Sequence, residues 1–441
     1  MMSWMAGLLA LTPFSNFLNV VTVLSILVPS FIIYMYKTTV YVEDMLYGLN
    51  EMNGMLMFLT ISLALLVYLS SSYFKASSYG PILFLLVIAI MLCFSMADLL
   101  LFYIFFEISL LPIFIMLLGW GYQPERLQAG LYMIFYTVFG SLPLFFLILF
   151  LGSNMSTYGL YFMWNVQVEF MNWLFYIGFF AFMIKLPIWS LHVWLPKAHV
   201  EAPLGGSMML AGALLKLGGY GLYIYNMIGV TSLLSTLGVA WLFVAMWGGL
   251  CASLICLSQS DIKGMIAYSS IVHMSLVVLG ILSNTTWGSF CALMTMVAHG
   301  WASSALFMCA FITYEKVGSR SFNYTKGILT GFPMLGFFWF LFCSTNMAVP
   351  PSINLMGELA AIPVAFSLSA SLLLVLLLIM FMSVTYNMYM YIKINHGSKS
   401  WYITSGVPVS SRWFLIMTGH LFPLIFLFNM DMMSLYTVNC M

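Results

Sequence analysis

Charged residues are scarce in this sequence, and their scarcity excludes most classes of protein. Only 6% of the 441 residues are Asp, Glu, Lys or Arg, whereas an ordinary soluble domain has about 25%. So few charges would not cover a water-soluble fold, and they leave no basic face for nucleic acid. Because 63% of the residues are hydrophobic and 17% are aromatic, the class that remains is a polytopic membrane protein.

Motifs for metal, redox and nucleotide chemistry are also missing. None of the seven cysteines stands in a C-x-x-C pair, and most lie within apolar runs, which is typical of small packing residues and not of metal ligands. The sequence has no Walker loop and no dinucleotide fingerprint. Its N-terminus lacks the basic region of a signal peptide and the arginine-rich pattern of a transit peptide. The sequence therefore predicts no metal site and no nucleotide site on this chain.

Hydrophobic runs long enough to cross about 30 Å of hydrocarbon predict thirteen membrane spans. These lie near residues 14–36, 53–73, 81–97, 99–120, 128–151, 171–194, 204–226, 233–258, 264–282, 287–314, 327–348, 354–392 and 409–430. Transmembrane strands are excluded because the runs are too long and do not alternate between polar and apolar residues. We therefore predict an all-α polytopic membrane protein.

The distribution of cations supports this count. Ten of the thirteen lie in even-numbered loops: Lys75, Arg126, Lys197, Lys263, Lys316, Arg320, Lys326, Lys393, Lys399 and Arg412. The odd-numbered loops hold only Lys37, and the remaining two cations lie within spans. Because basic loops stay on the inside, the N-terminus is predicted inside and the C-terminus outside.

Two of the predicted spans are expected to be broken helices. Residues 327–392 must cross the membrane twice, yet they exceed the about 40–50 residues that two helices need. The surplus surrounds Pro350 and Pro351. Residues 184–206 carry three prolines and predict a second break. Backbone freed at membrane depth is tolerated only against protein or a wet cavity, and paired breaks are typical of transporters with an internal repeat.

Four charged residues fall inside predicted spans: Glu107, Lys185, Lys216 and Glu358. Each costs about 2.5–3.5 kcal/mol to insert, and folding alone gives no reason to retain them. Lysine and glutamate that are deprived of water can exchange a proton at ordinary pH. We therefore expect an ion or proton path. The alternative is a static ion pair that fixes the register of the helices.

Histidines supply further candidates for proton transfer. His273 and His299 fall in the middle of spans, among Ser and Tyr hydroxyls, as members of a relay would. The alternative for each is a satisfied core histidine. The other histidines are predicted near the membrane interfaces and are given no role: His192, His199, His396 and His420.

Other polar and small residues have simpler explanations. Asp98, Asp261 and Lys263 stand at the ends of predicted spans, where membrane anchoring accounts for them. Six glycines surround Lys216 in the sequence and favour close helix packing. These are Gly205, Gly206, Gly212, Gly218, Gly219 and Gly221.

Several motifs are similar to one family. They are FYIFFEISLLP with WGYQPERLQAG, then IKLPIWSLHVWLPKAHVEAP, LLKLGGYG, DIKGMIAYSSIVHM and PPSINLMGE. In this order, over about residues 98–360, they resemble the chain 4 family of mitochondrial NADH–ubiquinone oxidoreductase (respiratory complex I), which is related to the large subunits of multi-subunit sodium/proton antiporters. The family fold is a bundle of usually fourteen helices with two inverted five-helix repeats, each with one broken helix.

The resemblance implies the roles of individual residues. Glu107 corresponds to the glutamate of the family's fifth helix, and a lateral row for protons would comprise Lys185, Lys216, His273, His299 and Glu358. A half-channel from the matrix would lead to this row, and an exit would lead to the opposite side. The span numbers run one lower than in the family, so its first helix is missing here unless residues 1–12 are a shortened remnant.

The resemblance also implies a domain plan and a setting. The expected parts are N-terminal helices (1–97), a first repeat (98–226), a second repeat (227–392) and a C-terminal helix (393–441). The chain would translocate protons in the mitochondrial inner membrane, beside other membrane-arm subunits, including neighbouring antiporter-like chains, and lipids. Its high methionine content, 37 residues, is typical of proteins translated inside mitochondria. Flavin, iron–sulfur clusters, NADH and ubiquinone would bind to other subunits, so no cofactor is expected on this chain.

Two other functions fit some of these residues. A subunit of a multi-subunit sodium/proton antiporter would share Glu107, Lys185, Lys216 and Glu358, and the mass and flavin content of the native assembly would distinguish it. A structural spacer of the membrane arm, which transports nothing, is the third possibility. Unchanged pumping in a conservative mutant of a buried charge would support that reading.

Overall fold

A computed structural model describes residues 24–25, 27–28, 42–43, 48–49, 51–71, 78–155, 157–160, 162–163, 172–229, 236–398, 401 and 409–425. Several sequence predictions lie outside these residues: most of the span 14–36, the shortened helix at 1–12, and Lys37, Lys75 and Lys399. The predicted orientation of the chain in the membrane rests partly on those cations and stays a prediction.

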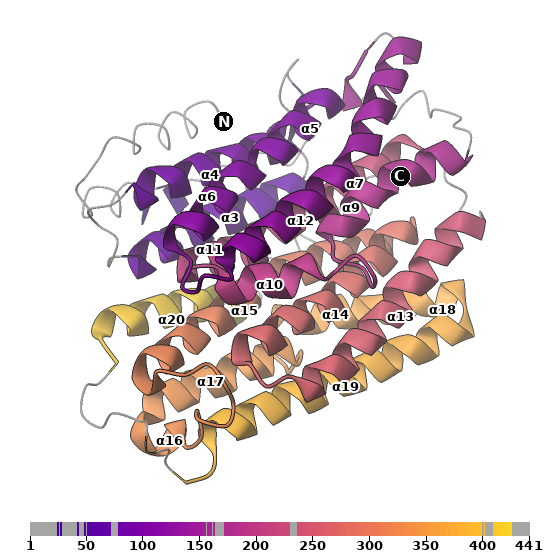
Figure 1. Cartoon of the computed structure of the whole chain (residues 1–441). Coiled ribbons are helices and arrows are strands. Elements are labelled where there is room, and N and C mark those ends of the chain that lie inside the picture. The colour runs from indigo at the N-terminus through magenta and orange to yellow at the C-terminus, as the bar shows by residue number, and fades with distance from the viewer. Residues whose placement is uncertain are drawn as a thin grey trace. The chain divides into compact units, whose positions relative to one another are not determined.

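The described chain is almost entirely helical (Figure 1). In hydrocarbon no water satisfies backbone N–H and C=O groups, so apolar runs of this length fold as helices. The helices are α3 (Glu51–Ser70), α4 (Tyr79–Ser95), α5 (Leu99–Ile108), α6 (Leu110–Trp120), α7 (Arg126–Met155), α9 (Asn172–Lys185), α10 (Trp194–Glu201), α11 (Leu204–Met209), the π-helix η2 (Leu210–Leu214), α12 (Leu215–Ile228), α13 (Thr236–Ser258), α14 (Ile262–Leu282), α15 (Thr286–Val317), α16 (Ile328–Gly331), α17 (Pro333–Asn346), α18 (Ile353–Leu368), α19 (Ala370–Asn395) and α20 (Ser411–Ile425).

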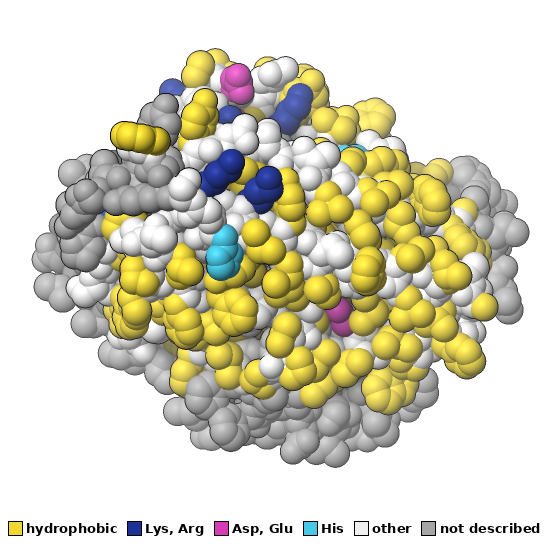
Figure 2. All heavy atoms as spheres, turned by 90° about the horizontal axis from the view of Figure 1, so that it is seen from below, with side chains coloured by type: hydrophobic (Ala, Val, Ile, Leu, Met, Phe, Trp, Pro, Cys, Tyr) yellow, Lys and Arg dark blue, Asp and Glu magenta, His cyan; other side chains and the backbone are white. Residues whose placement is uncertain are grey.

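Helix lengths confirm the membrane class. Eight helical spans in the described ranges are long and apolar enough to cross a membrane, and three shorter helices are apolar. Two of the eight join consecutive helices: Leu99–Trp120 comprises α5 and α6, and Leu204–Ile228 comprises α11, η2 and α12. Helices α7 and α19 expose large apolar side chains, such as Phe139 at 70% and Phe381 at 66%. Figure 2 shows hydrophobic side chains over most of the face on view, with Lys and Arg gathered in its upper part. Such apolar exposure suits a lipid environment.

Both predicted helix breaks are present. Helix α9 ends at Lys185 and α10 begins at Trp194, while α17 ends at Asn346 and α18 begins at Ile353. Each break contains a non-glycine residue in the left-handed region, Ser190 (φ 75°) or Ala348 (φ 60°). Such strain costs on the order of 1–3 kcal/mol and tends to occur at functional sites.

Two further features differ from the sequence prediction. The run 354–392 is not one helix but two, α18 and α19, which are separated at Ser369; the Ser369 hydroxyl caps α19 by accepting from the Leu372 N–H at 3.2 Å. Two short antiparallel strands, β1 (Val42–Glu43) and β2 (Gly48–Leu49), pair with Val42 opposite Leu49.

The chain divides into two compact units. The first comprises Met1–Leu186 with Glu201–Ala240, and the second comprises Pro187–Val200 with Trp241–Met441. In the first unit α9 packs against α7 and α12, and in the second α15 packs against α14, α17, α18 and α20. The domain boundaries taken from the sequence remain a prediction.

The two units share a local feature at the start of one helix. Asp98 precedes α5 and Asp261 precedes α14, and both have φ −101° and ψ 133°. Each forms an antiparallel bridge with a residue beyond the next long helix, Asp98 with Gly159 and Asp261 with Ser321. The same antiparallel backbone bridge therefore joins the start of one helix to the chain beyond another helix in both units.

Candidate functional site

The predicted site residues divide equally between the two units. Glu107, Lys185 and Lys216 lie in the first unit, while His273, His299 and Glu358 lie in the second. All except Glu107 are at most 4% exposed. Each set is described within its own unit.

Lys185 is the last residue of α9, which ends because Pro187 cannot continue the helix. Its ammonium Nζ donates a hydrogen bond of 2.9 Å to the carbonyl of Phe106 and lies over the ring of the same residue. The Ser109 hydroxyl donates to that carbonyl as well, at 2.8 Å. Lys185 is thus bound by backbone and aromatic groups of α5, with its side chain almost fully buried.

Glu107 follows Phe106 on α5 and lies close to both Ser141 of α7 and Lys185, with which it interacts electrostatically. Its Oε1 atom is buried and has no hydrogen-bond partner among the described residues. The Lys185 ammonium donates its hydrogen bond to the Phe106 carbonyl, and its interaction with the Glu107 carboxylate is electrostatic.

Lys216 lies in the first turn of α12 and is fully buried. Its Nζ donates a hydrogen bond of 2.6 Å to the carbonyl of Ala211, which belongs to the preceding π-helix η2. A π-turn widens the helix and commonly marks a functional site. Here the widened turn presents a carbonyl to the buried ammonium group of Lys216.

Glycines bring α12 close to α9, as the sequence predicted. A Cβ added at Gly218 would lie 3.0 Å from the Lys185 Cβ and 3.3 Å from the Leu186 backbone nitrogen. A Cβ at Gly221 would meet the ring of Phe182. Lys185 and the helix that carries Lys216 therefore pack directly together within the first unit.

His273 of α14 and His299 of α15 face each other. Their ring centroids lie 5.3 Å apart at an interplanar angle of 45°, and each residue is 1% exposed. The neighbouring Ser269, Ser270 and Ser275 hydroxyls donate to carbonyls of their own helix. The structure therefore pairs the two rings directly, while these three hydroxyls are engaged with the backbone.

Glu358 lies on α18, in the second turn after the break, and is 4% exposed. The preceding Gly357 touches the backbone of Thr295 in α15, where a Cβ would come within 3.1 Å of the Thr295 nitrogen. Cys291 and Tyr386 are close enough to interact electrostatically with the carboxyl group. Close backbone contact with α15 thus fixes the position of Glu358.

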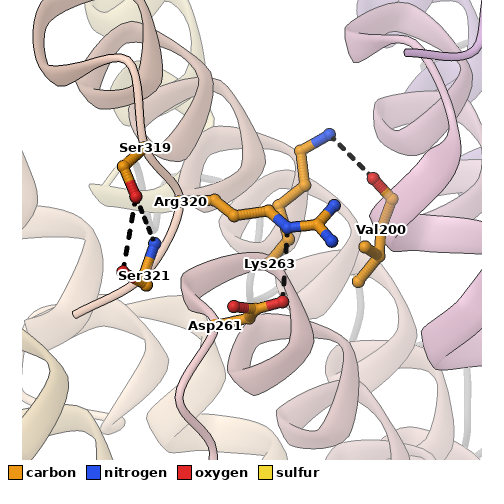
Figure 3. Close-up of polar contacts among 6 residues, drawn as sticks. All are labelled: Val200, Asp261, Lys263, Ser319, Arg320 and Ser321. Carbon is orange, nitrogen blue, oxygen red and sulfur yellow. Dashed lines mark hydrogen bonds and ion pairs between the residues drawn. The ribbon is translucent and has the colours of Figure 1, made fainter. Parts of the chain in front are cut away.

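Lys263 does more than anchor a span end. It is 7% exposed, and its Nζ donates a hydrogen bond of 3.3 Å to the Val200 carbonyl near the end of α10 (Figure 3). In the same view the Arg320 guanidinium and Asp261 form an ion pair of 3.3 Å. A cation at a helix C-terminus is favourable because of the helix dipole, so Lys263 holds α10 against α14.

Three of the histidines given no role are more buried than the sequence suggested. His192 lies in the first break and stacks on Trp189 with centroids 4.9 Å apart. His199 stacks on Phe307 of α15 at 4.7 Å. His420, fully buried in α20, pairs its Nδ1 with the Ile416 carbonyl at 2.9 Å. The His199 contact ties α10 to α15, and both residues belong to the second unit.

Sequence reasoning missed the π-helix and the backbone partners of both lysines. It also missed a set of three buried asparagines near the second break, Asn346, Asn354 and Asn387. Their signal was available, because asparagine is rare in apolar spans and two of them flank Pro350-Pro351 in the sequence.

Metal-ligating residues do not cluster in the described part of the chain. No group of three or more His, Cys, Asp or Glu side chains there is arranged to hold a metal ion. The described cysteines are free thiols: Cys93, Cys251, Cys256, Cys291, Cys309 and Cys343. Cys440 lies outside the described residues.

Comparisons with known proteins agree with this architecture. A protein of Albinaria caerulea named NADH-ubiquinone oxidoreductase chain 4 is 42% identical over 376 residues, 85% of this chain and 86% of that protein. The protein of the same name from Latimeria chalumnae is 38% identical over 360 residues, 80% of this chain and 77% of its own length.

Solved structures show the same fold. A chain of respiratory complex I from Thermus thermophilus with bound NADH superposes with a TM-score of 0.88 at 20% identity, covering 99% of this chain and 98% of that one. A chain of the Mrp complex from Dietzia sp. DQ12-45-1b superposes with a TM-score of 0.83 at 15% identity, covering 99% and 95%. Residues 96–384 match the family described as NADH:quinone oxidoreductase/Mrp antiporter, TM. With its two broken helices and its buried lysines, this chain belongs to that family of antiporter-like membrane subunits.

Proposed function

We propose that this chain is a proton-translocating membrane-arm subunit of the respiratory NADH:ubiquinone oxidoreductase. It is a multi-pass protein of the mitochondrial inner membrane, and its partners are the other membrane-arm subunits, including neighbouring antiporter-like chains. Relatives named as chain 4 of this enzyme, at 38–45% identity, support the proposal. Redox chemistry takes place on other subunits, which bind the flavin, iron–sulfur clusters, NADH and ubiquinone.

The observation that carries the proposal is the burial of charged side chains in membrane-spanning helices. Lys216 is fully buried, while Lys185 and Glu358 are each 4% exposed. Charges at such depth cost about 2.5–3.5 kcal/mol each and mark ion or proton pathways by default. The hydrogen bonds that the two lysines donate to backbone carbonyls reduce this cost without cancelling the charge, so these groups can still gain and lose protons.

Each unit has the parts of a proton relay. In the first, Glu107 adjusts the electrostatic field at Lys185, and Lys216 lies on the helix that packs against Lys185. In the second, the imidazole rings of His273 and His299 pass protons between α14 and α15, and Glu358 is the acid beside the second break. Energy from quinone reduction elsewhere in the complex would enter by moving charges such as Glu107.

The runner-up function is a subunit of a multi-subunit sodium/proton antiporter. The similarity to the Mrp chain favours it only weakly, because at 15% identity the likeness shows the fold alone. Purification of the native assembly separates the two functions. The respiratory enzyme is far larger and contains flavin, whereas an antiporter assembly has no flavin.

The decisive experiment replaces buried titratable groups in the assembled enzyme. Glu358→Gln and Lys216→Met keep similar volume and remove the titrating group. Both should assemble and lose most of the protons pumped per electron, measured in closed vesicles. Glu125→Gln and Lys393→Met, which change exposed residues, are the matched controls. An unaltered number of protons pumped per electron in both Glu358→Gln and Lys216→Met would refute the proposal.

A further inference from the structure

The second helix break is held together by side-chain amides. Helix α17 ends at Asn346 and α18 begins at Ile353. The Asn354 Nδ2 atom donates a hydrogen bond of 3.3 Å to the Asn346 carbonyl and so joins the two halves across the break. The Asn346 Nδ2 donates at 3.0 Å to Asn387 Oδ1 of α19, and the Asn387 Nδ2 donates at 2.9 Å to the Ser383 carbonyl.

Two buried side-chain oxygens at this break do not take part in the hydrogen bonds of the asparagine network. Asn354 Oδ1 and Ser352 Oγ are buried and have no hydrogen-bond partner among the described residues. Ser352 and Asn354 are 2% and 1% exposed. Ser352 occupies the N-cap position of α18, yet its hydroxyl does not cap the helix. Buried polar atoms nearly always have a partner, which can be an ordered water molecule.

Polar groups lie on one side of these two oxygen atoms, and apolar side chains close the other side. The first N–H groups of a helix have no partner within the helix, so the start of α18 adds donors near the two unsatisfied oxygens. Ile353 packs into an apolar cluster with Met294 and Ala298 of α15, which closes the other side. A buried water molecule needs two to four polar partners, and this end of α18 supplies them.

Glu358 lies one helical turn beyond Asn354. Residues four apart on a helix share a face, so the Asn354 amide and the Glu358 carboxyl point along the same side of α18. Tyr386, which precedes Asn387 on α19, interacts electrostatically with Glu358. The asparagine network and the buried acid are therefore parts of one polar region of the second unit.

We propose that Ser352 and Asn354 bind an ordered water molecule at the α17/α18 break, and that this water exchanges protons with Glu358. The Glu358 carboxyl group gives its proton to the water, which releases a different proton to a neighbouring water. The carboxylate and an intact water molecule remain, and the reverse sequence reloads the acid. Asn346 and Asn387 are positioning residues that hold the site open. The exchange step rests on the proposed function, whereas the binding of water does not.

The first test is direct. A high-resolution map of the assembled complex should show a water molecule within about 2.7–3.2 Å of Asn354 Oδ1 or Ser352 Oγ. A dry site, with both oxygens contacting only apolar atoms, would overturn the proposal. If the water is present but Glu358→Gln pumps normally, the water site stands and the proposed function fails.

The second test separates water binding from packing. Asn354→Leu fills the space with an apolar side chain, whereas Asn354→Ala leaves room for water to replace the amide. We expect the pumping rate to fall about tenfold or more in the Leu variant and clearly less in the Ala variant. If the Ala variant is as impaired as the Leu variant, the amide is only a structural clamp. Asn395→Leu, at a buried asparagine in the last turn of α19, is the matched control.

A smaller change covers the case in which the Asn354 variants fail to assemble. Ser352→Ala removes one oxygen and creates little space. The number of protons pumped per electron by the assembled enzyme should fall. Unchanged pumping in Ser352→Ala would overturn the assignment of the hydroxyl to the water site.

Discussion

Gly357→Ala tests whether the close approach of α18 to α15 positions Glu358. The added Cβ would lie 2.6 Å from the Thr295 Cγ2 atom and 3.1 Å from the Thr295 nitrogen. Carbon atoms pack best about 3.5–4.0 Å apart, so α18 must move away by about 1 Å. Overpacking of this kind typically costs about 1–3 kcal/mol, and a misplacement of about 1 Å can slow a reaction about 100-fold.

The assay compares the amount of assembled complex with its proton pumping. We expect Gly357→Ala to assemble at a reduced level and to pump about 10- to 100-fold more slowly. The double variant with Thr295→Ser should recover much of this loss, because serine lacks the clashing Cγ2 and keeps the hydroxyl that donates to the Cys291 carbonyl at 2.8 Å. Gly119→Ala, with no atom within 4 Å of the new Cβ, should be harmless. Full pumping by Gly357→Ala alone, or no recovery in the double variant, would refute this reasoning.

Three further predictions follow from the other contacts. Glu107→Gln should assemble but lose pumping, and Glu107→Asp should retain part of it; if Glu107→Gln reduces only assembly while the assembled enzyme pumps fully, the gating role is wrong. Lys263→Met should loosen α10 by removing the hydrogen bond to the Val200 carbonyl, so proteolysis near the first break should become faster. Lys263→Arg should keep the break protected from proteolysis. Arg320→Gln should change thermal stability by less than about 1 kcal/mol, because the ion pair with Asp261 is partly exposed and screened; a larger loss of stability would show that this pair, and not the backbone bridge, clips α14.

Hydropathy and proline placement predicted most of the fold. Runs such as 287–314 stand out because only a helix satisfies its backbone in hydrocarbon, and Pro187 and Pro350 marked both breaks. The division of 354–392 at Ser369 was missed because a serine within an apolar run gives no signal until its hydroxyl is seen to cap α19.

The candidate site was predictable in its residue types but not in its contacts. Lys185 and Lys216 stood out because a buried charge is costly enough to be rare. Their partners, the Phe106 and Ala211 carbonyls, were not predictable, because every residue has a carbonyl and only tertiary packing selects one. The facing rings of His273 and His299 likewise depend on how α14 and α15 pack, which a single sequence does not encode locally.

The assignment of residues 187–200 to the second unit has a consequence for how the chain is made. Helix α10 is synthesised before α14 and α15, which contact it through Lys263 and Phe307. It therefore cannot reach its final packing until those later helices have been made. A chain cut at residue 240 would leave the second unit without this segment. Lys185 ends α9 just before the chain passes into α10's unit. The backbone of residues 186–193 therefore links this lysine covalently to the segment that α14 and α15 hold.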